Sequence, residues 1–114
     1  MLSWSGHHSD VDVDLDAVSC GHGDVGIPLG AELLRFATAA AVLAGDVTEL
    51  DAARRALVAR AGEAVMVDAA AVVANFQMMT RLADGTGARY PAAHLAASEP
   101  TIARMGAATM SSRR

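Results

Sequence analysis

Apolar side chains recur every three or four residues after Pro28, at Leu29, Leu33, Phe36, Ala37, Ala40 and Leu43. This spacing places them along one face of a helix. Proline suits the first turn of a helix, and Gly45 suits a helix end. The pattern therefore predicts a first helix over residues 28–44.

A second helix is predicted from Thr48 to the glycine at position 62. Thr48 followed by Asp51 resembles a capping box, in which the usual acid is glutamate. Asp51 and Arg55 are spaced for an ion pair along the helix surface. The apolar stripe of this segment consists of Leu50, Ala53, Leu57, Val58 and Ala61.

The third segment, residues 63–84, is more apolar than the first two. Asp68 and Asn75 fall on one side of the predicted helix, and Gln77, Arg81 and Asp84 fall nearly opposite. Two apolar flanks separate these sides: Val65, Ala69, Val72 and Phe76 form one, and Val67, Ala71, Ala74 and Met78 form the other.

A helix that is apolar on two flanks needs two packing partners. The first two helices can cover one flank, so we expect the other to meet a second subunit. The segment is too short and too polar to span a membrane comfortably. The helix pattern therefore predicts a homo-oligomer and no membrane partner.

The chain ends show weaker patterns. Residues 1–27 carry no helical stripe and are expected to form an irregular acidic segment, ahead of a helical domain over residues 28–106. A last short helix is predicted from Ser98 to about Gly106, and residues 107–114 are expected to be a frayed tail.

Composition supports one small all-α domain. The chain has 114 residues, of which 53% are hydrophobic and only 4% aromatic, so its core must be built from Ala, Val, Leu and Met. The net charge of −4 argues against nucleic acid. All nine basic residues are Arg, as in proteins of high-GC bacteria. The absence of a signal-peptide pattern and the single cysteine favour a reducing cytoplasm.

The segment "VDAAAVVANFQMMTRLADGTG" at residues 67–87 resembles the closing helix of the alkylhydroperoxidase D-like and carboxymuconolactone decarboxylase-like family. Asn75-Phe76 and the Arg81-x-Ala83-Asp84 run carry the resemblance. The preceding segment, with its Arg-Phe-Ala core and Thr-capped helix, is also similar, so the resemblance covers roughly residues 28–87. It implies an all-helical oligomer, such as a dimer, trimer or hexamer.

Peroxidase members of that family carry a Cys-x-x-Cys pair with a histidine shortly after it. This chain has no such pair, so the resemblance assigns no catalytic residue to it. Cys20 and His22 are the candidates for a one-cysteine centre, since a neighbouring histidine can favour the thiolate. Such a centre would need an external thiol to resolve its sulfenic acid.

The acidic stretch "VDVDLDAVSCGHGD" at residues 11–24 contains aspartates, a cysteine and a histidine, which are residue types that bind metals. An EF-hand loop needs Gly at its sixth position and Glu at its twelfth, and both possible registers lack them. A structural zinc site needs more closely spaced Cys and His residues than Cys20 and His22, even with His7 and His8. We therefore expect no metal, no cofactor and a solvated acidic segment.

Three polar residues of the third helix are candidates for structural or interface roles. Asn75 lies among apolar neighbours, so its amide is expected to hydrogen-bond a neighbouring helix or subunit. Arg81 precedes Asp84, which is the less favourable order for an ion pair within one helix, so their partners are expected elsewhere.

The sequence thus predicts a self-associating family-like helical domain without dithiol chemistry of its own. The alternative is a thiol-dependent peroxidase or decarboxylase-like enzyme that uses Cys20 and His22 or a catalytic segment upstream of Met1.

Overall fold

The computed structural model describes residues 12–42, 45–89 and 91–106, and these residues contain helices and no strand. The helices are α2 (Leu15–Cys20), α3 (Gly30–Ala41), α4 (Val47–Ala61), α5 (Glu63–Thr86) and α6 (Ala92–Arg104). The predicted all-α class is confirmed. No described helix is long and apolar enough to cross a membrane.

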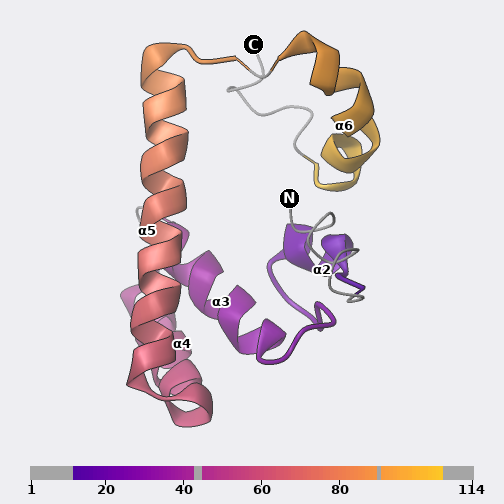
Figure 1. Ribbon diagram of the computed structural model, residues 1–114. Helices are drawn as coiled ribbons and strands as arrows, with labels where there is room; N and C mark the ends of the chain where they lie inside the picture. Colours follow the sequence, from indigo (N-terminus) through magenta and orange to yellow (C-terminus); the bar gives the residue numbers. More distant parts are fainter. Residues whose placement is uncertain (1–11, 43–44, 90, 107–114) are drawn as a thin grey trace.

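Helices α3 and α4 pack against each other and against the first half of α5 (Figure 1). Their shared core is centred on Phe36, Ala53 and Leu57, and Leu57 is fully buried. Helix α5 contributes only half-buried side chains to this core: Met66, Ala69 and Ala70. Small alanines at these contacts let the helices approach closely.

Helix α4 begins earlier than predicted, because its cap is Asp46 rather than Thr48. The Asp46 carboxylate accepts a hydrogen bond from the Thr48 backbone N–H at 2.8 Å. The predicted Asp51–Arg55 ion pair is confirmed at 2.7 Å, and Gly62 ends the helix as predicted. The first predicted helix, residues 28–44, is wrong at both ends, since α3 runs from Gly30 to Ala41.

The N-terminal segment is not wholly irregular, and that part of the prediction is wrong. Helix α2 forms because Asp14 caps its first turn and Gly21 ends it in the left-handed conformation, with φ of 75°. Gly30, the first residue of α3, lies so close to Val25 that a Cβ atom at this position would clash with the Val25 side chain. Residues 1–11, including His7 and His8, lie outside the described residues.

Helix α6 begins at Ala92, before the predicted start at Ser98, and contains Pro100. The alanine-rich segment ahead of Pro100 has high helix propensity, which extends the helix towards Pro91. The predicted tail of residues 107–114 lies outside the described residues.

The molecule is open rather than tightly packed. Its radius of gyration is 15.2 Å, compared with about 13 Å for a compact domain of 100 residues. The second half of α5 rises beyond α3 and α4, and the chain then crosses to α6, which lies near α2 (Figure 1). This arrangement leaves much of α5 without cover from the other helices.

Candidate interaction surface

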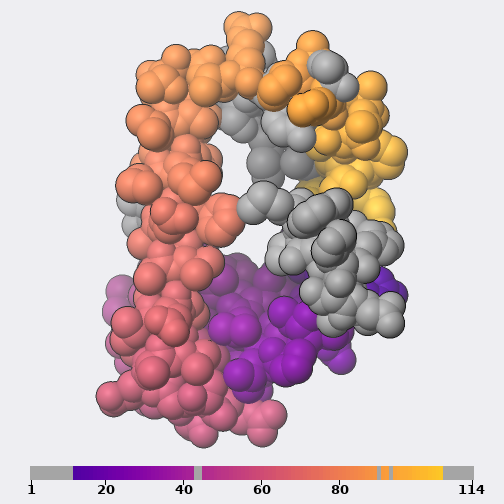
Figure 2. Space-filling view, in the orientation of Figure 1, coloured from indigo at the N-terminus to yellow at the C-terminus, as the bar shows by residue number. Residues whose placement is uncertain are grey.

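The exposed side of α5 is the most distinctive surface of the described structure. Helix α5 has 24 residues, which gives a length of about 36 Å. Helix α4 has 15 residues, or about 22 Å, so neither it nor the shorter α3 can cover α5 to its end. In the space-filling view, α3 and α4 lie beside the lower part of α5 and its upper part stands clear of them (Figure 2).

Six large apolar side chains of α5 are more than half exposed. Their exposed fractions are 58% for Val67, 56% for Val72, 52% for Phe76, 59% for Met78, 52% for Met79 and 63% for Leu82. Scattered exposed apolar residues are common on soluble proteins, whereas a concentration of them on one element is a candidate interaction surface. We call these six residues the α5 apolar surface.

The α5 apolar surface lies on the side of the helix that faces away from its own core. At about 100° per residue, the six side chains span roughly half of the helix circumference, between Val67 at one edge and Phe76 at the other. The core contacts Met66, Ala69 and Ala70 lie opposite. Helix α5 therefore has an apolar side towards its neighbours and a second one towards solvent.

The two flanks predicted from the sequence are partly confirmed. The flank containing Val67, Ala71, Ala74 and Met78 is exposed along its whole length. The other flank is only half covered, because Val65 and Ala69 are half-buried and Val72 and Phe76 are exposed. The predicted flanks omit Met79 and Leu82, although their helical positions lie between the exposed members and could have revealed them.

Asn75 lies in the middle of this surface and is exposed, not buried in the core of the single chain. Its amide nitrogen donates a long hydrogen bond of 3.7 Å to the sulfur of Met79. A contact to a weak sulfur acceptor leaves most of the amide's hydrogen-bonding capacity unused. The expected role of Asn75 at a subunit interface stays a prediction.

Arg81 and Asp84 are exposed on the other side of α5. Within the described residues neither forms an ion pair. A structural ion pair of these side chains within one chain is therefore not seen, and a partner in another subunit stays a prediction.

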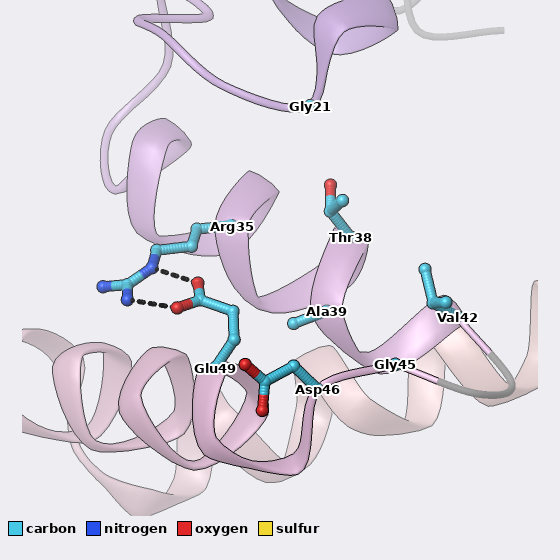
Figure 3. A pocket seen from close by; sticks show the side chains of 8 residues that line it. All are labelled: Gly21, Arg35, Thr38, Ala39, Val42, Gly45, Asp46 and Glu49. Atoms are coloured by element: carbon cyan, nitrogen blue, oxygen red, sulfur yellow. Dashed lines mark hydrogen bonds and ion pairs between the residues drawn. The ribbon is translucent and has the colours of Figure 1, made fainter.

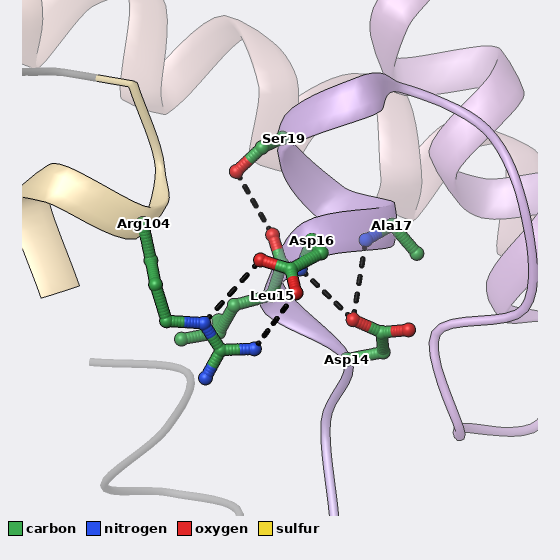
Figure 4. Close-up of polar contacts among 6 residues, drawn as sticks. All are labelled: Asp14, Leu15, Asp16, Ala17, Ser19 and Arg104. Atoms are coloured by element: carbon green, nitrogen blue, oxygen red, sulfur yellow. Dashed lines mark hydrogen bonds and ion pairs between the residues drawn. The ribbon is translucent and has the colours of Figure 1, made fainter.

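The acidic stretch is used to build the N-terminal segment (Figure 4). The Asp14 carboxylate accepts hydrogen bonds from the backbone N–H groups of Asp16 and Ala17 at 2.9 and 3.3 Å. Asp16 accepts two hydrogen bonds from Arg104 of α6, at 3.3 and 3.2 Å. Asp24 accepts one from the Gly26 backbone N–H at 2.9 Å. Asp14 thus caps α2, Asp16 connects α2 to α6, and Asp24 stabilises a turn.

The Asp16–Arg104 contact joins residues 88 positions apart in the sequence. The hydrogen bonds that Arg104 donates to Asp16 raise the pKa of Arg104, and the charges of Asp16, Asp14 and Asp12 add to this effect. The pattern of apolar and polar positions does not predict this ion pair, because its two residues lie on different helices that are far apart in the sequence.

Cys20 is the last residue of α2 and is exposed, and His22 is exposed just beyond Gly21. Neither side chain has a hydrogen bond or ion pair with a residue that the structure describes. Cys20 lies at the C-terminal end of its helix, whereas activated cysteines are favoured at N-terminal ends. Among the residues that the structure describes, no base or cation therefore forms a hydrogen bond or ion pair with the thiol.

A shallow depression of about 280 Å³ lies between α2, α3 and α4 (Figure 3). Arg35 of α3 and Glu49 of α4 meet at its edge through two hydrogen bonds of 2.7 and 2.9 Å. The hydrogen bonds from Arg35, and then its charge, lower the pKa of Glu49, and those to Glu49 raise the pKa of Arg35. The two charges neutralise each other, so this depression offers no free cation to an anionic ligand.

No three His, Cys, Asp or Glu side chains gather as a metal-binding group in the part of the chain that the structure describes. The expectation of no metal and no cofactor stays a prediction. No protein-family model, curated protein or solved structure matches this chain.

Proposed function

We propose that this chain is a self-associating helical domain, alkylhydroperoxidase D-like in its three central helices and without a dithiol of its own. The α5 apolar surface carries the proposal. It is exposed in the single chain, and it lies opposite the side that packs on α3 and α4. A second subunit would remove it from water.

The apolar surface is large enough to offset much of the cost of association. Fully burying one large apolar side chain contributes about 1.5–3 kcal/mol, so covering the exposed half of six contributes about 6 kcal/mol per subunit, or about 12 kcal/mol for a symmetric pair. Association costs about 4–15 kcal/mol in lost translational and rotational freedom. The favourable end of this balance is about −8 kcal/mol, which corresponds to a dissociation constant near 1 μM.

The family-like part of the proposal rests on residues 28–87. The three helices that share the core, α3, α4 and α5, are the three that the resemblance spans, and Phe36 of the Arg-Phe-Ala segment is a central core residue. With Cys20 as the single cysteine, the chain has no second thiol to resolve a sulfenic acid within one subunit. Self-association, rather than peroxidase turnover, is the property that its surface supports.

The test compares two matched substitutions by analytical ultracentrifugation at micromolar concentration. Ala74→Glu places a charge within the exposed flank of α5, and a charge buried without a partner destabilises an interface. Ala59→Glu adds the same charge at an exposed position of α4, away from that flank. We expect Ala74→Glu to lower the average mass and Ala59→Glu to leave it unchanged. Equal masses for both variants and wild type would place the interface elsewhere.

A further inference from the structure

The α5 apolar surface has an internal symmetry that bears on how its partner is oriented. Asp68, Asn75 and Leu82 are seven residues apart, so they lie nearly on one line along the helix, opposite the core contacts. Asn75 is midway between the other two. All three side chains are exposed.

Two further pairs of exposed residues lie on either side of this line. Ala71 and Met78 lie on one side, and Val72 and Met79 lie on the other. Each pair contains a smaller side chain before Asn75 and a larger one after it. Along these two rows the side chains are therefore smaller in the first half of the surface and larger in the second half.

Resting on the proposed self-association, we propose that two copies of α5 pair in antiparallel orientation about a twofold axis at Asn75. In such a pair, residues equally far before and after Asn75 lie at the same level. Ala71, four residues before Asn75, then lies within one residue, about 1.5 Å, of the level of the partner's Met78 on the same side of the pair, and Val72 lies equally near the level of the partner's Met79. Large side chains fill the space left by small ones, which is the condition for dense packing.

Parallel pairing would lose this fit. It would place Ala71 beside the partner's Ala71 and Met78 beside the partner's Met78, which leaves a gap at one level and crowding at another. It would also bring Asp68 beside the partner's Asp68, and like charges at short distance repel. In the antiparallel pair, Asp68 and the partner's Asp68 lie seven residues on opposite sides of the axis, about 21 Å apart along the helices, so these like charges are kept apart.

The antiparallel arrangement also gives the Asn75 amide a partner. Asn75 lies on the axis and therefore meets the partner's Asn75, and two amides can each donate and accept a hydrogen bond. A single polar residue within an otherwise apolar helix pair fixes the register of the two helices. Asn75 is thus the residue that sets the alignment of the pair.

Disulfide cross-linking tests the orientation, because a disulfide needs Cα atoms within about 7 Å. All variants carry Cys20→Ser, which removes the native thiol. Ala71→Cys and Met78→Cys are made separately, and Ala59→Cys, on the exposed side of α4, is the matched control. Each variant is oxidised alone, and the first two are also oxidised after mixing and subunit exchange.

Antiparallel pairing predicts a strong cross-link only in the mixture of Ala71→Cys and Met78→Cys. In that arrangement the two copies of position 71 are about 12 Å apart along the axis, at 1.5 Å per residue. The control should give no cross-link. Ultracentrifugation of the same reduced samples reports whether they associate.

The outcomes separate this inference from the proposed function. Associated samples in which Ala71→Cys cross-links with itself would show parallel pairing and overturn the inference while leaving self-association intact. Associated samples with no cross-link at any of these positions would also overturn it, because the interface would lie elsewhere. Monomeric samples would overturn both proposals.

Discussion

Replacing Leu57 by alanine tests the core on which the whole arrangement rests. The side chain of Leu57 is 0% exposed and lies in the cluster with Phe36 and Ala53. Leu→Ala at fully buried positions costs about 2–5 kcal/mol, of which the larger values belong to cavities that cannot collapse. Met66 packs against this cluster and is flexible enough to fill part of the space. We therefore expect a loss of about 3 kcal/mol.

The expected loss for Leu57→Ala is a large part of the total free energy of unfolding. Domains are stable by about 5–15 kcal/mol, and the described core contains few fully buried side chains. At roughly 4 °C per kcal/mol for a chain of about this length, the midpoint of thermal unfolding should fall by about 12 °C. Urea denaturation gives the same free energy independently.

Leu82→Ala is the matched control, because it is the same chemical change at a side chain that is 63% exposed. Its effect should act through association, so it should vary with protein concentration, whereas the change caused by Leu57→Ala should not. A loss below about 1 kcal/mol for Leu57→Ala, or equal losses for both variants at every concentration, would refute the packing described for α3, α4 and α5.

Three other predictions follow from single contacts. Gly30→Ala should lower the free energy of unfolding, because its Cβ would clash with the Val25 side chain, whereas Gly85→Ala, with open space around it, should raise that free energy by up to about 1 kcal/mol; the reverse order would contradict the close approach. The pKa of Glu49 is lowered from 4.5, so its stabilising contribution is present above that value and is lost as pH falls through the lowered pKa. Acid titration of unfolding midpoints should therefore show a shallower decline for Glu49→Gln, and identical profiles would show that the contact with Arg35 is unimportant. With excess dithiothreitol, wild type and Cys20→Ser should consume hydroperoxide no faster than buffer; a wild-type rate that the substitution abolishes would establish an enzyme.

Periodicity and end signals predicted the second and third helices well. Gly62 separates them as expected, and α5 starts at Glu63 and extends only two residues beyond the prediction. These features are local, so they can be seen in the sequence. Helix α2 was missed because its signal is a single capping aspartate, Asp14, followed by six residues, too few for a hydrophobic stripe.

Contacts between distant residues could not be predicted. The pairs Arg35–Glu49 and Asp16–Arg104 depend on how helices cross, which periodicity does not specify. The two apolar flanks of α5 indicated a second partner, but not which parts of each flank the chain itself covers. The covered part depends on the lengths of α3 and α4 relative to α5. These lengths explain why Val72 and Phe76 are exposed although Val65 and Ala69 are half-buried.

The mass of the wild-type protein in solution tests the central claim most directly. Sedimentation equilibrium across the micromolar range should give a weight-average mass that rises with concentration towards a multiple of 11.7 kDa. The α5 apolar surface would then be covered by other copies of the chain. A mass of one chain throughout that range would contradict self-association.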